Sequence, residues 1–300
     1  MFANEHYELI DFGAGRKLER FGSLVLDRPS PAAQQATKAK PSAWNNPHAR
    51  FQKTAGTAGE WISRNGVENC WPWQFGPVEV ELRTTPFGHV GVFPEQAENW
   101  CWLADQLARQ EHGLRVLNLF AYTGISSLVA AQYGAHVVHL DAASNIVAWA
   151  RHNAKQSRLD QRPIRWIVED ARKFTQRELR RGNHYDAVIL DPPSYGHGPK
   201  GESWQLAAHL ADLLQDCLSL TAGAPHFFLL TCHTAGMGTN RLAETLKQAG
   251  LPSNGSLETT CLTLPTSDGR KLESGLVARW SQLPNRPQRQ RLRTSHHFTP

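Results

Sequence analysis

The chain has 300 residues, of which 40% are hydrophobic and 20% are charged, and it carries a formal net charge of +5. These proportions are those of a globular protein, and no apolar run approaches the roughly 18 residues that a membrane-spanning helix needs. We therefore expect no membrane association. Because the first residues lack the basic-then-apolar pattern of an export signal, we also expect a cytoplasmic location. The mild basic excess is compatible with a polyanionic partner.

The five cysteines and fourteen histidines form no recognisable metal-binding pattern. No CxxC, HxxxH or HExxH spacing occurs, which argues against a zinc ribbon and against a metal site in general. An odd number of cysteines without paired spacing also argues against a disulfide framework. We expect no metal, and free thiols in a reducing compartment.

Residues 1–98 are rich in Gly, Pro and Trp and predict a small β-rich N-terminal domain. Short strands divided by turns are expected at 7–13, 20–29 and 78–93, and a long polar loop at 29–51. The "GAGRK" stretch that begins at Gly13 mimics a nucleotide-binding loop, but no apolar helix follows it, so we interpret it as a turn. Aromatic and basic residues in this domain could stack on RNA bases, but for most of the tryptophans a place in the core fits better; the set is Trp44, Trp61, Trp71, Trp73, Arg50 and Arg64.

From residue 99 to 284, strands and helices are expected to alternate. The predicted strands are continuous apolar runs, as in parallel strands covered on both faces, at 115–121, 136–142, 164–170, 186–192 and 226–232. The predicted helices lie at 125–133, 143–156, 171–181, 202–220 and 239–249. This order predicts an α/β fold with a doubly wound, mostly parallel, seven-stranded sheet. The last two strands, 257–265 and 272–281, have only a turn between them and predict an antiparallel hairpin at one sheet edge.

The last segment, 285–300, is a basic tail with four arginines, Arg286, Arg289, Arg291 and Arg293. Two interpretations stay open. The tail is either a solvated terminus or an arm that neutralises phosphates, and the second would make binding to nucleic acid strongly salt-dependent.

Polar residues and one glycine follow four of the predicted parallel strands, where such sheets bind ligands. Gly124 allows a tight turn and a close approach of the backbone to a ligand. Asp141, seventeen residues further on, is placed to bind the hydroxyls of a ribose, and Asp170 and Asp191 end the next two strands. The GxGxxG fingerprint of dinucleotide enzymes and a phosphate-binding loop are both absent. A nucleoside ligand without phosphates fits better, and S-adenosylmethionine is the commonest one.

The ordered series "LNLFAYTG", "HLDAA", "VEDA" and "LDPPSYG" resembles the class I S-adenosylmethionine-dependent methyltransferases. More narrowly, it is similar to the bacterial family of large-subunit rRNA cytosine-5 methyltransferases, over residues 88–235. The segment "HVGVFPEQAENW" resembles the stretch that leads into that family's catalytic domain, and by this resemblance Gln96 faces the cofactor. The resemblance implies that the methionine moiety is surrounded by Asn118, Phe120, Tyr122, Thr123 and Gly124. It also implies that Asp141 and Ala142 hold the ribose, Asp170 and Ala171 the adenine, and that Asp191 and Pro192 lie near the methyl group.

The methyl acceptor is less determined than the cofactor. A pyrimidine C5 needs a thiolate to add at C6 first, and Cys232 at the end of a predicted strand, in a Thr-Cys pair, resembles the nucleophile of RNA cytosine-5 methyltransferases. His233 beside it could help to lower the thiol pKa. An amino nitrogen needs only a rigid acidic turn, and Asp191-Pro192-Pro193 offers one, although the aromatic residue comes one position late. We favour RNA, cytosine C5 and the Cys232 nucleophile.

Three alternatives stay open: amino-nitrogen transfer, a non-catalytic nucleic-acid-binding protein that keeps the fold, and a methyltransferase acting on a small molecule or a protein. The residues 1–98 do not match a known RNA-binding module, which keeps the substrate class open. The sequence also leaves open whether the protein forms a homodimer.

Overall fold

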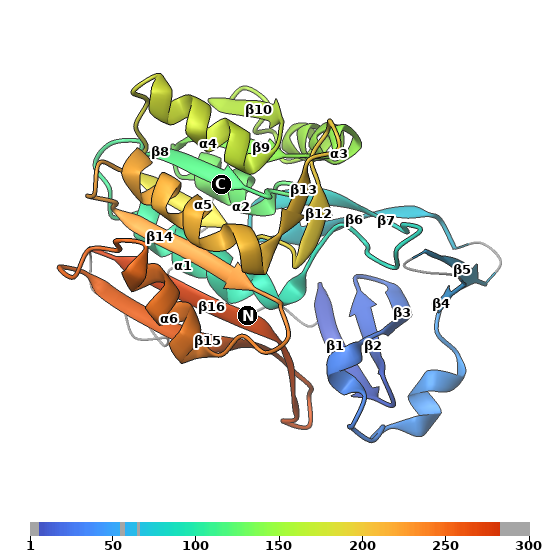
Figure 1. Ribbon diagram of the computed structural model, residues 1–300. Helices are drawn as coiled ribbons and strands as arrows, with labels where there is room; N and C mark the ends of the chain where they lie inside the picture. Colours follow the sequence, from blue (N-terminus) through green and yellow to red (C-terminus); the bar gives the residue numbers. More distant parts are fainter. Residues whose placement is uncertain (1–5, 55–57, 65–66, 283–300) are drawn as a thin grey trace. The chain divides into compact units, whose positions relative to one another are not determined.

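The computed structural model describes residues 6–54, 58–64 and 67–282, and it divides into two compact units (Figure 1). The N-terminal unit contains the described residues up to Glu98 together with Leu262–Ser274. The second unit contains Asn99–Cys261 and the described residues from Gly275 onward, and we call it the catalytic unit because most of the site residues predicted from the sequence lie in it. The basic tail predicted at 285–300 lies outside the described residues.

The N-terminal unit is built on a five-stranded sheet with its strands in chain order. These strands are β1 (Tyr7–Gly13), β2 (Arg16–Phe21), β3 (Leu24–Pro29), β4 (Ala49–Lys53) and β5 (Gly59–Ser63). A separate two-stranded sheet is formed by β6 (Cys70–Phe75) and β7 (Val78–Arg83), and short 3-10 helices lie at η1 (Pro31–Ala33), η2 (Pro41–Asn45) and η3 (Pro94–Gln96). The core includes Phe21, Leu26, Phe51, Trp71 and Trp73, all buried. The two last-named tryptophans are therefore core residues rather than exposed stacking platforms.

Three predictions for this unit were wrong in detail. The strand expected at 78–93 is β7 and ends at Arg83, because a turn with Gly88 at a φ of +77° follows it. The single strand expected at 20–29 is interrupted at Gly22, whose φ of +59° makes the turn between β2 and β3. The loop expected at 29–51 contains η1, η2 and the start of β4, and it is ordered by polar contacts that no local pattern reveals. The "GAGRK" stretch is the β1–β2 turn, as predicted.

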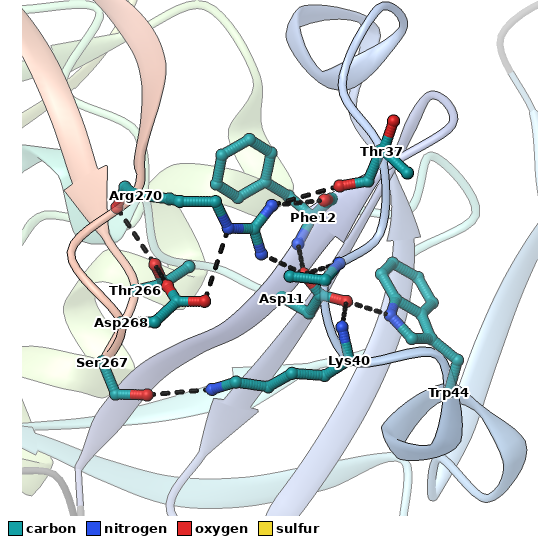
Figure 2. A network of polar contacts seen from close by, with 10 residues as sticks. Asp11, Phe12, Thr37, Lys40, Trp44, Thr266, Ser267, Asp268 and Arg270 are labelled. Atoms are coloured by element: carbon teal, nitrogen blue, oxygen red, sulfur yellow. Dashed lines mark hydrogen bonds and ion pairs between the residues drawn. The ribbon is translucent and has the colours of Figure 1, made fainter.

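Those polar contacts centre on Asp11 of β1, which is fully buried (Figure 2). Its carboxylate accepts hydrogen bonds from the backbone N–H groups of Ala39 (3.1 Å) and Lys40 (2.9 Å) and from the indole of Trp44 (2.7 Å). It also pairs with the guanidinium of Arg270, from the hairpin tip between the last two strands. One carboxylate thus holds the 37–45 loop and the 266–270 turn onto the same strand.

A seven-stranded sheet, most of which lies in the catalytic unit, has the strand order β10-β9-β8-β11-β14-β16-β15, which confirms the predicted doubly wound α/β class (Figure 1). The strands are β8 (Arg115–Leu119), β9 (His136–Asp141), β10 (Ile164–Val168), β11 (Ala187–Leu190), β14 (Phe227–Cys232), β15 (Ser256–Pro265) and β16 (Lys271–Ser281). The first five pair in parallel, and β16 runs antiparallel to β14 with β15 at the edge. The helices are α1 (Ala97–Leu107), α2 (Ile125–Gln132), α3 (Ser144–Gln156), α4 (Ala171–Arg180), α5 (Leu206–Leu220) and α6 (Thr239–Gln248).

The helix predicted at 202–220 begins later than expected. Ser203–Gln205 form β13, which pairs with β12 (Tyr195–His197) in a small hairpin after the acidic turn. The reason is the tertiary position of Trp204, whose side chain is 3% exposed and donates its indole N–H to the carbonyl of Pro193 at 2.7 Å. Helix α5 can begin only after this anchored residue.

No helix among the described residues has the length and apolar character needed to cross a membrane.

Candidate active site

The strand order of the large sheet changes direction between β8 and β11. On one side of β8 lie β9 and β10, and on its other side lie β11 and β14. In open parallel sheets, ligands bind at the carboxyl ends of the strands beside such a switch point. The predicted site residues of the catalytic unit follow β8, β9, β10, β11 and β14, so the topology brings them to one edge of the sheet.

The loop after β8 has an unusual backbone. Phe120 (φ +55°), Tyr122 (φ +52°) and Gly124 (φ +97°) all adopt left-handed conformations, and two of the three are not glycine. Such conformations cost of order 1–3 kcal/mol each and cluster at ligand sites. Helix α2 follows Gly124 directly, and its N-terminus has no side-chain cap. The strained loop and the uncapped helix start suit the close approach of a polar ligand to the backbone.

Close packing makes Gly124 necessary. A Cβ at this position would come 3.1 Å from the Cβ of Ala150 in α3, on a backbone that L side chains rarely adopt. The loop is also held from below, since the carbonyl of Thr123 accepts a hydrogen bond from the amide of Asn153 at 2.9 Å. Thr123 itself is 1% exposed.

Asn118 is buried and belongs to a polar chain beneath the loop. Its amide donates to the hydroxyl of Ser127 at 2.9 Å, and that hydroxyl lies 3.0 Å from Nδ1 of His139. Burial lowers the pKa of His139 to about 3, so its ring is neutral. The structure therefore joins Asn118 to the start of α2, in a position that supports the loop.

Asp141 ends β9 beside this loop. Its two carboxylate oxygens accept the backbone N–H groups of Tyr122 (2.9 Å) and Ala143 (3.0 Å). Burial raises the pKa of Asp141, and these backbone hydrogen bonds oppose the rise. Asp141 and Ala142 keep partial exposure. The carboxylate thus stays available to a ligand while it fixes the loop that the ligand would contact.

Asp170 is the N-cap of α4, where its carboxylate accepts the backbone N–H of Lys173 at 3.0 Å. It and Ala171 are almost fully buried, at 5% and 4% exposure. Val168, at the end of β10 and opposite Asp141 in the ladder, is unusually open for a large apolar residue, at 41% exposure. An apolar surface beside a capping carboxylate is suited to a flat aromatic base.

Asp191 follows β11 and is followed by the buried Pro192. Its Oδ1 accepts a hydrogen bond from the hydroxyl of Thr231 and lies 3.3 Å from Nε2 of His233. Burial acts to raise the pKa of Asp191, but the contacts with His233 and Thr231 outweigh it and hold the pKa below its ordinary value. His233 has room for this contact because residue 275 is glycine: a Cβ there would come 2.5 Å from Nδ1.

Cys232 lies at the end of β14, one residue from each of these partners. Its side chain is 1% exposed and packs in the hydrophobic core of the unit. In the β14–β16 ladder it is opposite Leu276. The structure therefore brings Cys232 to the predicted edge but covers it, whereas the side chain of Asp191 is 33% exposed.

The hairpin after Asp191 contributes Trp204, which the sequence patterns missed. Trp204 contacts Phe120 with ring centroids 5.0 Å apart, in addition to its hydrogen bond to Pro193, so it ties the loop after β8 to the turn after β11. Tyr195 on the same hairpin is 76% exposed. In the sequence Trp204 falls at the start of a predicted helix. Its role becomes visible only in the structure, where β13, which contains it, pairs with β12.

Gln96 belongs to the N-terminal unit, in η3, and is 7% exposed. Its contact with a cofactor stays a prediction from the resemblance. Within residues 6–54, 58–64 and 67–282, no three His, Cys, Asp or Glu side chains are grouped as metal ligands would be.

The residues present fit S-adenosylmethionine. The left-handed loop and the uncapped start of α2 offer backbone donors to a carboxylate, Asp141 offers a carboxylate to ribose hydroxyls, and Val168 offers an apolar contact to adenine. The loop from Phe120 to Gly124 lacks the GxGxxG pattern by which dinucleotide sites bring the backbone close to a pyrophosphate.

Comparison with known proteins agrees with this geometry. The family described as S-adenosylmethionine-dependent methyltransferase matches residues 25–248. The crystal structure of the SAM-dependent methyltransferase from Agrobacterium tumefaciens is 37% identical and has a TM-score of 0.87, covering 93% of this chain and 91% of that one. The structure of SMU.776 complexed with S-adenosylhomocysteine has a TM-score of 0.70 at 17% identity, covering 92% of this chain and 76% of that one, and shares the fold.

Two curated relatives have matching segments. Ribosomal RNA large subunit methyltransferase I of Tolumonas auensis is 30% identical over 157 residues, 52% of this chain and 38% of the relative. Ribosomal RNA large subunit methyltransferase K/L of Colwellia psychrerythraea is 30% identical over 125 residues, 41% of this chain and 17% of the relative. The chain thus matches less than two fifths of the length of each relative.

The cofactor is S-adenosylmethionine, as predicted. The family model matches most of the chain, and the sheet has the class I strand order with polar residues at its switch point. This chain therefore belongs to the S-adenosylmethionine-dependent methyltransferases.

Proposed function

We propose that this enzyme methylates a base of ribosomal RNA. The proposal is supported by the names of the relatives from Tolumonas auensis and Colwellia psychrerythraea and by the net charge of +5. The observation that carries it is the arrangement around Asp191: an acidic Pro-Pro turn, held by Thr231 and His233, beside the strand that ends in the cofactor loop. An RNA substrate makes the cytoplasm the expected location.

For the cofactor we propose the following roles. The loop after β8 and the start of α2 bind the methionine moiety through the backbone of Phe120, Tyr122, Thr123 and Gly124, and Asn118 supports that loop from beneath. Asp141 and Ala142 bind the ribose, and Asp170, Ala171 and Val168 border the adenine. Asp191 and Pro192 lie toward the sulfonium side. S-adenosylmethionine supplies an electrophilic methyl group, so the protein must mainly align the acceptor and exclude water.

Cytosine C5 is the acceptor that the Thr231-Cys232 pair favours. The Cys232 thiolate would add to C6 of the base, which makes C5 nucleophilic. After methylation of C5, the C5 proton leaves to a base and the bond between Cys232 and C6 breaks, which restores the thiolate. His233 is the nearest titratable side chain in sequence, but its Nε2 is directed to Asp191 at 3.3 Å. This route requires that the buried Cys232 becomes accessible when RNA binds.

Transfer to an amino nitrogen is the second candidate, and a specific observation favours it. Cys232 is 1% exposed, whereas Asp191 is partly exposed and Tyr195 is 76% exposed on the adjacent hairpin. An amino group could donate to the Asp191 carboxylate while its ring stacks on an aromatic side chain, with no covalent intermediate.

Replacement of Cys232 by alanine distinguishes the two chemistries. For C5 transfer we expect at least a thousandfold loss of methyl transfer, because the nucleophile is gone, with unchanged binding of S-adenosylhomocysteine. The measurement is mass spectrometry of nucleosides from large-subunit rRNA, taken from a strain without the gene and incubated with labelled cofactor.

The matched control for that experiment is Cys217→Ala, because Cys217 is equally buried but lies in α5. A methylated amino nucleoside that persists in Cys232→Ala would move the assignment to nitrogen. If the wild-type protein methylates no RNA nucleoside at all, while it still binds S-adenosylhomocysteine, the RNA proposal is wrong.

Trp204→Phe tests the tie between the two loops of the site. Phenylalanine keeps an aromatic ring against Phe120 but removes the indole hydrogen bond to the carbonyl of Pro193, a loss of about 0.5–1.5 kcal/mol. If the turn at Asp191 is displaced accordingly, kcat for methyl transfer should fall about tenfold, with less effect on cofactor affinity. Trp61→Phe loses the same kind of bond, to Thr85 in the N-terminal unit, and serves as the control. Equal kcat in both variants would contradict the positioning role.

A further inference from the structure

The N-terminal unit contains a cleft with a volume of about 760 Å³ that has no part in the methyltransferase site described above. It lies on the five-stranded sheet and the segment that includes η1. Its lining residues are Gly15, Arg16, Pro29, Pro31, Gln34, Arg50, Gln52, Lys53 and Ile62. None of these lining residues is acidic, and three of them are cationic.

Two of the cations are held in place by one buried carboxylate. Asp27 is 2% exposed; its Oδ1 lies 2.5 Å from Nε of Arg16, and its Oδ2 lies 3.4 Å from Nε of Arg50. Arg16 also donates from Nη2 to the carbonyl of Phe51 at 2.9 Å. These contacts hold Nε of each guanidinium and, in Arg16, Nη2 as well. A pre-positioned guanidinium with further N–H groups is suited to phosphate oxygens, because its donors are fixed before the ligand arrives.

The positive charge of the three cationic lining residues exceeds the single negative charge of Asp27. The side chain of Arg50 is 55% exposed despite its ion pair. Lys53 is exposed and has no ion-pair partner among the described residues, and the two glutamines, Gln34 and Gln52, add neutral donors and acceptors. Glu60, opposite Gln52 in the β4–β5 ladder, is the acidic neighbour, but it does not line the cleft.

The cleft offers little to a base. Ile62, opposite Arg50 in the ladder and 53% exposed, is its large apolar residue, and none of its lining residues is aromatic. Base-stacking sites use aromatic side chains, whereas contacts to the nucleic-acid backbone use Arg, Lys and amide side chains. The composition of the lining therefore matches a phosphodiester chain.

We propose that this cleft binds the phosphodiester backbone of the RNA substrate, independently of sequence, and holds the RNA on the N-terminal unit. The proposal rests on the proposed RNA substrate of the enzyme, but it concerns a separate surface with its own readout. Arg50 and Lys53 contact phosphates, Arg16 orients the site through Asp27, and Ile62 contacts a sugar or base edge.

The test uses the full chain and a fluorescein-labelled oligouridylate of about 20 nucleotides, enough to span one such groove. The variants are Arg50→Ala, Lys53→Ala and the double variant. We expect the double variant to bind the RNA about tenfold more weakly at 0.1 M salt, and the slope of log affinity against log salt to fall in magnitude by about 1.4, or 0.7 for each lost contact. Cofactor binding, followed by the thermal shift with S-adenosylhomocysteine, should be unchanged.

Arg83→Ala is the matched control. Arg83 lies in β7 of the same unit, is 41% exposed and is paired with Glu81, but it is not in the cleft. It removes one charge and should change the affinity less than twofold. If removal of Arg50 unfolds the unit by leaving Asp27 underpaired, Lys53→Glu alone keeps the test valid, because Lys53 has no ion pair to lose.

Two outcomes would overturn the proposal. The first is an unchanged affinity and salt slope in the double variant and in Lys53→Glu. The second is that polyglutamate of similar length binds the wild type as tightly as RNA and loses affinity by the same factor in the variants, which would assign the cleft to an acidic protein. A wild-type protein that binds oligouridylate through the cleft but methylates no RNA would refute the proposed function and leave the cleft assignment intact.

Discussion

Replacement of Asp11 by asparagine should destabilise the N-terminal unit by about 1–3 kcal/mol, because the buried side chain can no longer accept all of its hydrogen bonds. Asparagine is isosteric, but its amide NH₂ would replace one acceptor oxygen. In one orientation the NH₂ faces the donors of Lys40 and Trp44, and in the other it faces Ala39 and Arg270 (Figure 2). Both orientations place donors against donors. The measurement is chemical unfolding followed by circular dichroism.

Asp268→Asn is the control for that result. Asp268 also pairs with Arg270, at 3.5 Å, but its side chain is 37% exposed and should contribute less than about 1 kcal/mol. If Asp11→Asn and Asp268→Asn unfold at the same denaturant concentration as the wild type, the network in Figure 2 is not a significant source of stability.

The same carboxylate predicts an acid-sensitive contribution to stability. Burial acts to raise the pKa of Asp11, but hydrogen bonds from Trp44, Lys40, Arg270 and Ala39 outweigh it and lower the pKa from 3.8 to about 2. Since the folded-state pKa is below the unfolded one, this contribution is complete above about pH 4 and is lost as the pH falls through 2. Its size is of order 2 kcal/mol. Asp11→Asn should flatten the decline of stability between pH 4 and 2, and an identical decline in both proteins would contradict the assignment.

Asp141→Ala should lower the affinity for S-adenosylhomocysteine by about 10- to 100-fold. A hydrogen bond to a charged group contributes about 1.5–3 kcal/mol, and the alanine loses the proposed ribose contact. It also frees the backbone N–H groups of Tyr122 and Ala143, so the left-handed loop after β8 loses its anchor. Isothermal titration calorimetry with S-adenosylhomocysteine measures the effect.

Asp141→Asn should fall between the wild type and alanine, because it keeps one acceptor oxygen. Asp160→Ala is the matched control, since Asp160 is an exposed carboxylate in the turn after α3 that contacts only its neighbour Gln161 among the described residues. Wild-type affinity in Asp141→Ala would exclude the strand-end carboxylate from cofactor binding and, with it, the proposed orientation of the cofactor.

Local pattern in the sequence determined the sheet of the catalytic unit. The apolar runs that became β8, β9, β10, β11 and β14 are long enough to be identified alone, because parallel strands buried on both faces must be apolar throughout. Gly124 and Asp141 were identifiable for a related reason: the strand–turn–helix order dictates where a strand ends, and the residue at that end faces the ligand edge.

Tertiary structure decided which of these residues are accessible and what holds them. Cys232 and Asp191 both end strands, but Cys232 packs into the core while Asp191 pairs with His233, 42 positions along the chain, and remains partly exposed. Helix α5 begins at Leu206 rather than at 202, because the indole of Trp204 is hydrogen-bonded to the carbonyl of Pro193 across the β12–β13 hairpin. Burial depends on what packs above a residue, and no local pattern contains that information.

The N-terminal unit depended most on tertiary structure. Asp11 and Arg270 are 259 positions apart, yet they pair, and the same carboxylate holds the 37–45 loop. Similarly, Arg16 and Arg50 come from two strands, and Asp27 of a third strand holds both of them at one cleft after β3 pairs with β4. Hydrophobic periodicity is a property of neighbouring residues, so the strands and helices that depend on it could be predicted from the sequence. Ion pairs and clefts arise from distant segments, and only the folded chain brings them together.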